Sequence, residues 1–84
     1  MTNFHTVDVI EAKACLPLKD ATCLVCSNRG DKTHAGDIEL CLDNSDDTFL
    51  LKFDERQEFN GKFSQICFKR VDGKDKIRLD IFEA

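Results

Sequence analysis

Residues 37–53, DIELCLDNSDDTFLLKF, alternate apolar and polar side chains on both sides of a short polar cluster. Residues 37–43 place an apolar side chain at every second position, which is the period of a β-strand with one buried face. Residues 44–47, NSDD, are turn-forming types, and the alternation resumes after them. The stretch therefore predicts an antiparallel hairpin. The side chains expected to point into the core are Ile38, Leu40, Leu42, Phe49, Leu51 and Phe53.

The C-terminal third of the chain shows the same alternation. Residues 76–81, KIRLDI, have a strict period of two and predict a half-buried strand. The dipeptide Asp72-Gly73 precedes it, and Asp-Gly between two strand-forming runs is typical of a tight hairpin turn. We therefore expect residues 62–71 to pair antiparallel with residues 75–82.

The first third of the chain is less regular. Residues 22–27, TCLVCS, predict a strand. Residues 6–15 fit a strand or a short helix capped by the first residue, and their β-branched side chains favour the strand. Pro17 should end that element. Residues 54–61, DERQEFNG, indicate a loop or one helical turn that ends near Gly61.

These segments together predict the fold class. Five or six short strands are separated by turn signals, and no long amphipathic helix is present to cross over between parallel strands. We therefore expect residues 1–84 to form a single all-β domain. Its architecture should be a small antiparallel barrel or a two-sheet sandwich of five or six short strands, with at most one short helical turn.

The composition excludes several classes of protein. Hydrophobic residues make up 42% of the chain and charged residues 33%, which is too apolar for intrinsic disorder. No apolar run approaches the roughly 18 residues that a membrane helix needs, and the N-terminal sequence lacks the pattern of a signal peptide. We therefore expect a cytoplasmic protein without membrane contact. So short a chain has little scaffold to enclose a catalytic pocket, so we expect no enzyme and no catalytic residue.

The five cysteines bear on both redox state and metal binding. An odd number without an export signal predicts thiols in a reducing, intracellular environment. Cys23, Cys26, His34 and Cys41 have the residue types of a zinc site. If residues 22–27 form a strand, however, the first two thiols point to opposite faces. We therefore expect no cofactor, with structural zinc as the alternative.

The charge is concentrated in the middle of the chain. Residues 37–58 carry eight acidic and two basic residues, whereas the whole chain has a net charge of −4. A row of outward carboxylates attracts a basic protein surface and accelerates encounter with it. We therefore expect a non-enzymatic protein-interaction module, a small inhibitor or adaptor. The residues expected to bind the partner are Asp37, Glu39, Asp43, Asp46, Asp47, Asp54 and Glu55.

Two further modes of binding are predicted. The acidic middle of one copy could meet the basic C-terminal segment of another, or short edge strands could pair, and either contact would give a homo-oligomer. The basic C-terminal hairpin also has the residue types of a single-stranded nucleic-acid site. The net negative charge and the isoelectric point of about 5.0 make this alternative the less favoured one. Its candidate residues are Phe68, Lys69, Arg70, Lys74, Lys76 and Arg78.

Overall fold

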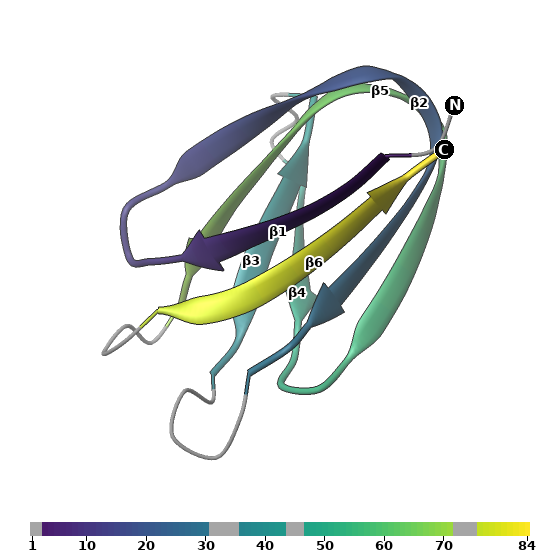
Figure 1. Ribbon diagram of the computed structural model, residues 1–84. Helices are drawn as coiled ribbons and strands as arrows, with labels where there is room; N and C mark the ends of the chain where they lie inside the picture. Colours follow the sequence, from purple (N-terminus) through teal and green to yellow (C-terminus); the bar gives the residue numbers. More distant parts are fainter. Residues whose placement is uncertain (1–2, 31–35, 44–46, 72–75) are drawn as a thin grey trace.

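The computed structural model describes residues 3–30, 36–43, 47–71 and 76–84, and within these ranges it contains strands and no helix. The strands are β1 (Asn3–Val9), β2 (Ala14–Asn28), β3 (Ile38–Leu42), β4 (Thr48–Leu51), β5 (Arg56–Arg70) and β6 (Ile77–Glu83). They form one antiparallel sheet in the order β1-β6-β2-β5-β3-β4 (Figure 1). The all-β antiparallel fold class is therefore confirmed.

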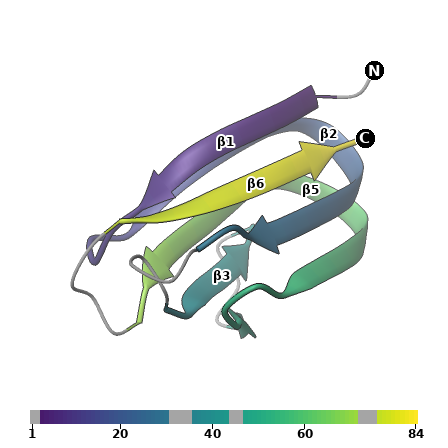
Figure 2. The same ribbon diagram turned by 60° about the horizontal axis from the view of Figure 1, so that its bottom comes forward.

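The two longest strands, β2 and β5, carry the sheet around a bend. The first half of β2 pairs with the second half of β5, as in Cys15 opposite Cys67, and the second half of β2 pairs with the first half of β5, as in Val25 opposite Glu58. The register shifts between Pro17 and Cys23. Both strands arch over at their midpoints (Figures 1 and 2). The sheet therefore folds into two layers that resemble a sandwich. It does not close into a barrel, because β1 and β4 are its edge strands.

The two layers enclose one hydrophobic core. One layer contains β1, β6, the second half of β2 and the first half of β5, and the other contains β3, β4 and the remaining halves. Alternate residues of each strand supply the core, as a period of two requires. Its buried members are Val9, Leu18, Ala21, Leu24, Cys26, Ile38, Leu40, Leu42, Leu51, Ile66, Phe68, Ile77, Leu79 and Ile81.

The predicted hairpin of residues 37–53 is present, with Ile38 opposite Leu51. Two of its expected core residues are not buried: Phe49 is 42% exposed and Phe53 is 45% exposed. Phe53 lies beyond the end of β4 at Leu51, and Phe49 lies within β4 at the edge of the sheet. The ring of Phe49 instead packs edge-to-face on Phe59, with 5.0 Å between the ring centroids.

The predicted hairpin between residues 62–71 and 75–82 is wrong. The second half of β2 lies between β5 and β6 in the sheet order, and it pairs with both of them. The chain therefore passes from one layer to the other between Arg70 and Ile77, instead of turning back beside β5. The Asp72-Gly73 turn itself lies outside the described residues.

Two segments that the sequence predicts to interrupt the strands lie mostly or wholly within strands. Pro17 lies inside β2, in the half that pairs with β5 alone within the described sheet, and a residue without an N–H group is tolerated where one side of a strand is unpaired. The loop or helical turn predicted for residues 54–61 is limited to Asp54 and Glu55, because β5 begins at Arg56 and continues through Gly61. Gly61 has a φ of 154°, a conformation that favours glycine.

A disulfide joins β2 and β5 through directly opposite residues, Cys15 and Cys67, whose Cα atoms lie 4.0 Å apart. The expectation that all five cysteines are thiols is therefore wrong for this pair. Opposite residues of an antiparallel pair share one face of the sheet, which brings the two sulfurs together although 52 positions separate them in sequence. A structural disulfide is unusual in a reducing cytoplasm, so it weighs against the cytoplasmic expectation.

The bend of β5 should depend on Gly61. A Cβ atom there would lie 3.1 Å from the Phe63 ring, in addition to the strain of the positive φ. We expect Gly61→Ala to lower the free energy of unfolding by about 1–3 kcal/mol, measured by urea denaturation. The neighbouring exposed change Asn60→Ala should stay within about 0.5 kcal/mol of wild type. Equal stabilities of the two variants would contradict the role of the glycine.

Thiol counting should detect the Cys15–Cys67 bond. Protein purified without reductant and unfolded in denaturant should react with a thiol reagent at three sites, and at five sites after reduction. Removal of the cross-link should lower the free energy of unfolding by about 4 kcal/mol, the chain-entropy value for a loop of this length. A count of five thiols before reduction would show that the bond is absent.

Candidate binding surface

The outer face of the layer formed by β1, β6, β2 and β5 carries an unusual apolar row. Phe4 lies opposite Phe82 across β1 and β6, and Phe82 lies opposite Val25 across β6 and β2. The side chains of these three residues, here called the apolar row, share the solvent-facing side of the sheet. Phe4 is 61% and Phe82 39% exposed. Two aromatic rings therefore face solvent on a regular strand surface.

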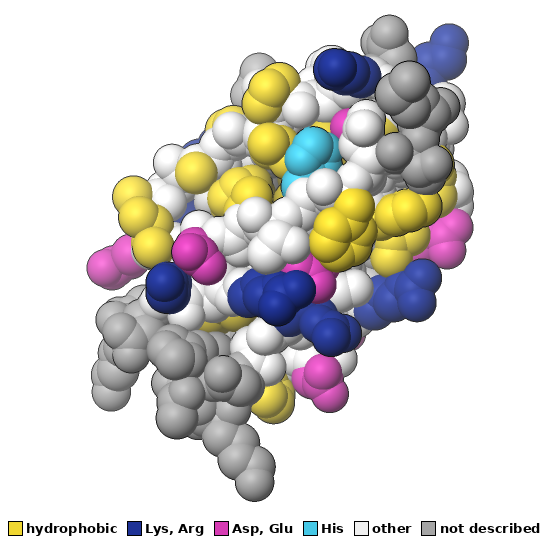
Figure 3. Space-filling view, in the orientation of Figure 1, with side chains coloured by type: hydrophobic (Ala, Val, Ile, Leu, Met, Phe, Trp, Pro, Cys, Tyr) yellow, Lys and Arg dark blue, Asp and Glu magenta, His cyan; other side chains and the backbone are white. Residues whose placement is uncertain are grey.

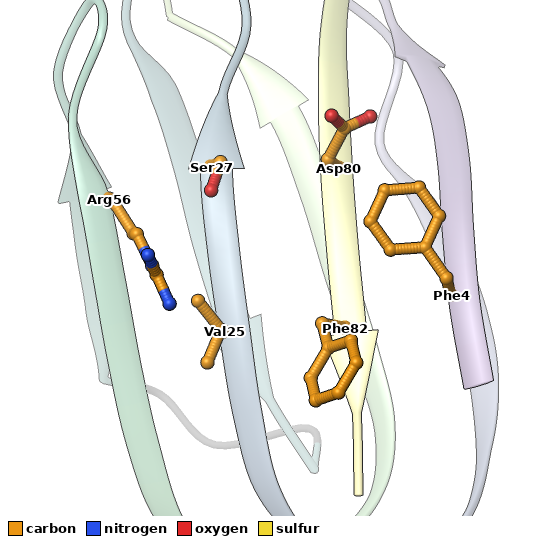
Figure 4. Close-up of a pocket in the computed structure, with 6 residues that line it drawn as sticks. All are labelled: Phe4, Val25, Ser27, Arg56, Asp80 and Phe82. Carbon is orange, nitrogen blue, oxygen red and sulfur yellow. The ribbon is translucent and has the colours of Figure 1, made fainter. Parts of the chain in front are cut away.

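A second row of side chains runs beside the apolar row, one pleat further along the strands. It consists of the directly paired residues Thr6, Asp80, Ser27 and Arg56, here called the polar row. A shallow cavity of about 280 Å³ lies between the two rows. Figure 4 shows the residues that line it, with the Phe4 ring leaning from β1 toward β6. The cavity therefore has an apolar side and a charged side.

Asp80 organises the charged side of the cavity. It is 9% exposed, and its Oδ1 atom accepts hydrogen bonds from Thr6 Oγ1 at 3.0 Å and from Arg78 Nε at 3.1 Å. Its Oδ2 atom lies 3.6 Å from Arg29 Nε. One buried carboxylate thus holds two arginines whose side chains are largely exposed.

The charges on this face are of both signs. Figure 3 shows hydrophobic and basic side chains next to one another on the face that β1 and β6 present. Lys76 Nζ lies 3.7 Å from Asp8 Oδ2, beside the arginine cluster. Among the described residues of this face, four cations and three anions leave one excess positive charge. They are Arg29, Arg56, Arg78 and Lys76, and Asp8, Glu58 and Asp80.

On the opposite side of β1 and β6, a cluster around Glu83 links β6 to β1, the strand that carries Phe4. Glu83 is 3% exposed, and its Oε1 atom accepts a hydrogen bond from Asn3 Nδ2 at 3.0 Å and lies 3.2 Å from His5 Nε2. Burial alone would raise the pKa of Glu83, but the hydrogen bonds from His5 and Asn3 outweigh it and the net pKa is lowered. Asn3 and His5 flank Phe4 in the chain, so this cluster fixes the edge strand that presents the ring.

Several acidic residues expected to bind a partner act as acceptors for the protein's own backbone. Asp43 Oδ1 accepts hydrogen bonds from Ser64 N at 2.7 Å and Gln65 N at 3.0 Å. These hydrogen bonds lower the pKa of the Asp43 carboxyl group. Asp37 Oδ1 accepts a bond from Phe53 N at 3.3 Å. These two carboxylates therefore stabilise turns and strand ends.

The remaining acidic candidates are spread around β3 and β4. Glu55 Oε1 accepts a bond from Lys52 N at 3.1 Å, and Glu39 lies 4.0 Å from Lys69 Nζ. Asp47 and Asp54 are exposed, and Asp46 lies outside the described residues. Residues 37 and 43 stand at the two ends of β3, roughly 20 Å apart at the usual rise per residue. The six acidic candidates that the structure describes are thus spread around β3 and β4 and do not form a single row.

The five basic and aromatic candidates that the structure describes do not share a surface. Phe68 and Arg70 are buried in β5, and Lys69 is on the outer face beside Glu39. Lys76 and Arg78 are in the other layer, next to Asp8 and Asp80. Lys74 lies outside the described residues. The separation follows from the position of β2 between β5 and β6.

The zinc candidates are also separated. Cys23 is outward-facing and Cys26 buried, as their spacing along a strand requires. Burial raises the pKa of Cys26 to about 12, which keeps this residue a thiol at neutral pH. Cys41 is in the other layer, and His34 lies outside the described residues. Among the described residues, no three potential metal ligands cluster together.

Comparison with known proteins adds no assignment to this surface. The sequence matches no protein-family model, and no curated protein shows a significant match to it. Within the described ranges, no helix is long and apolar enough to cross a membrane.

The Glu83 cluster should make stability depend on pH. A carboxyl group whose pKa is lowered in the folded state stabilises the fold above its unfolded pKa of about 4.3, and the contribution is lost as the pH falls through the folded pKa. We expect Glu83→Gln to cost about 1–3 kcal/mol at pH 7, and this difference from wild type should shrink below pH 4. Urea unfolding from pH 7 to 3 measures it.

The exposed carboxylate of Glu11 provides a control for this titration. Glu11→Gln should change the free energy of unfolding by less than about 0.5 kcal/mol at pH 7. A difference between Glu83→Gln and wild type that stays constant down to pH 3 would contradict the charged role of Glu83.

Proposed function

We propose that this protein is a non-enzymatic protein-interaction module that docks its partner on the outer face of β1, β6, β2 and β5. The observation that carries the proposal is the apolar row, with two exposed phenylalanines beside a shallow cavity. Binding energy at protein interfaces concentrates in such central aromatic clusters, which polar groups surround. A module of this kind acts by occupying its partner, as an inhibitor or an adaptor.

The charges around the apolar row favour a protein partner over a nucleic acid. Asp80 already pairs with Arg29 and Arg78, and the described residues of this face carry one positive charge in excess. The chain as a whole carries a net charge of −4. Nucleic-acid sites are instead strongly basic, because binding depends on neutralising phosphates. Charged residues of both signs around the apolar row favour a protein partner whose surface carries the complementary pattern of charges.

The geometry also favours this face over the acidic residues as the centre of the interface. Asp37, Asp43 and Glu55 already accept backbone hydrogen bonds. A partner that engaged those carboxylates would compete with bonds that hold turns of this protein. The apolar row has no comparable structural duty, since Phe4 and Phe82 are outside the core cluster.

Removal of the two rings should weaken binding to the partner. Immobilised wild-type protein is used to recover protein partners from an extract of the native cells, and the Kd of each purified partner is then measured. We expect Phe4→Ala/Phe82→Ala to raise that Kd about 30-fold, the effect of losing a central aromatic contact. Phe53→Ala, a matched loss of an exposed ring elsewhere, should change the Kd less than about threefold.

Two other outcomes would contradict this assignment. If Asp47→Asn/Asp54→Asn abolishes binding while the ring variant binds normally, the acidic residues form the interface. If a single-stranded oligonucleotide binds at low salt with a steep salt dependence that Arg56→Ala reduces, the face belongs to a nucleic-acid site. Thermal melting of each variant separates a lost contact from a lost fold.

A further inference from the structure

Three cysteines form a transverse row on the outer face of the second layer. Cys15 of β2 lies directly opposite Cys67 of β5, and Cys41 of β3 lies directly opposite Cys67 on its other side. Directly opposite residues in an antiparallel sheet point to the same face. The three sulfurs therefore share one face, with Cys67 in the middle. Cys15 and Cys67 form the disulfide, and Cys41 is a thiol.

The row has a shape suited to thiol–disulfide exchange. Adjacent strands are about 4.8 Å apart, and directly opposite side chains have Cβ atoms about 4.5–5.5 Å apart. Cys41 therefore approaches Cys67 from the side opposite to Cys15. The order Cys41–Cys67–Cys15 across the three strands is the order of nucleophile, central sulfur and leaving sulfur that in-line displacement at a disulfide requires.

The surroundings of the row also set it apart from the other cysteines. A cavity of about 230 Å³ opens beside Cys41 and Cys67, and Lys13 and Lys69 border it. Lys69 Nζ lies 4.0 Å from Glu39 Oε1, and both residues line this cavity. Cys23 and Cys26 are in the other half of β2, opposite Asn60 and Gln57 of β5, so neither belongs to the row.

We propose that the three-cysteine row is an intramolecular thiol–disulfide exchange site in which Cys41 displaces Cys15 from Cys67. Cys41 is 7% exposed and borders the cavity, so its thiol loses its proton to water in that cavity. Its sulfur then attacks Sγ of Cys67. The Cys41–Cys67 bond forms as the Cys15–Cys67 bond breaks, and the electron pair of the broken bond leaves on Cys15. The Cys15 thiolate then takes a proton from solvent. One disulfide and one thiol are present before and after, so no oxidant or reductant is consumed.

The exchange would move a covalent link within the sheet. In one isomer the link joins β5 to β2, and in the other it joins β5 to β3. The first isomer leaves the β3–β4 hairpin attached to β5 by non-covalent contacts alone, whereas the second releases the first half of β2. Cys15 is exposed, so the released thiol is accessible to small disulfides, such as oxidised glutathione, and to alkylating reagents.

The exchange is tested in the full chain carrying Cys23→Ser and Cys26→Ser, so that only the row remains. Oxidised protein is held at pH 8 without reductant, quenched with acid, alkylated and digested with trypsin. Cleavage after lysine and arginine places the three cysteines in separate peptides, 14–19, 33–52 and 63–69. We expect both the Cys15–Cys67 and the Cys41–Cys67 linkages. The minor isomer should be present at a detectable level, because both linkages join directly opposite residues of neighbouring strands.

Single changes in this background make the test decisive. Cys15→Ser, treated with oxidised glutathione, should form the Cys41–Cys67 disulfide. Cys67→Ser should form no internal disulfide, because Cys15 and Cys41 lie two strand spacings apart, roughly 9.5 Å, beyond the limit of about 7 Å between Cα atoms. Circular dichroism establishes that each variant is folded. The proposal is overturned if folded Cys15→Ser keeps Cys41 and Cys67 as separate thiols, or if Cys15 is never alkylated in the three-cysteine protein.

Discussion

The shared bend of β2 and β5 is the constraint on which the rest of the molecule depends. Each strand is 15 residues long and changes direction near its middle, where the register between the two strands shifts. In β5 the positive φ of Gly61 permits the turn, with Phe63 packed over it. Because the two strands bend together, one sheet becomes two layers around a single core. A small chain can thus bury apolar side chains from both layers.

The bend also decides which side chains meet on the outer faces. In one layer it brings β6 against the second half of β2, which places Phe4, Phe82 and Val25 in one row. In the other layer it brings β3 and the first half of β2 to either side of β5, which places three cysteines in one row. Both rows consist of residues far apart in sequence. Their chemistry follows from strand order, not from any local motif.

Local patterns in the sequence predict the strands well and their neighbours poorly. The period of two in residues 76–81 correctly assigns Ile77, Leu79 and Ile81 to the core. The same alternation places Phe82 on the outward face, together with the polar residues at positions 76, 78 and 80. An aromatic side chain among outward polar residues is the sequence feature from which the apolar row could have been predicted. Strand order could not be deduced, because the Asp-Gly dipeptide favours a hairpin locally whereas the insertion of β2 between β5 and β6 depends on tertiary pairing. The Cys15–Cys67 disulfide could not be predicted either, because it depends on the pairing of β2 with β5, which are far apart in sequence.

The strand order is tested most directly by nuclear Overhauser contacts in solution. We expect contacts from the ring of Phe82 to Val25 on one side and to Phe4 on the other, because β6 lies between β2 and β1. A ladder of contacts between residues 62–71 and 75–82 would instead make β5 and β6 neighbours. That result would contradict the fold, and both rows of side chains would be lost with it.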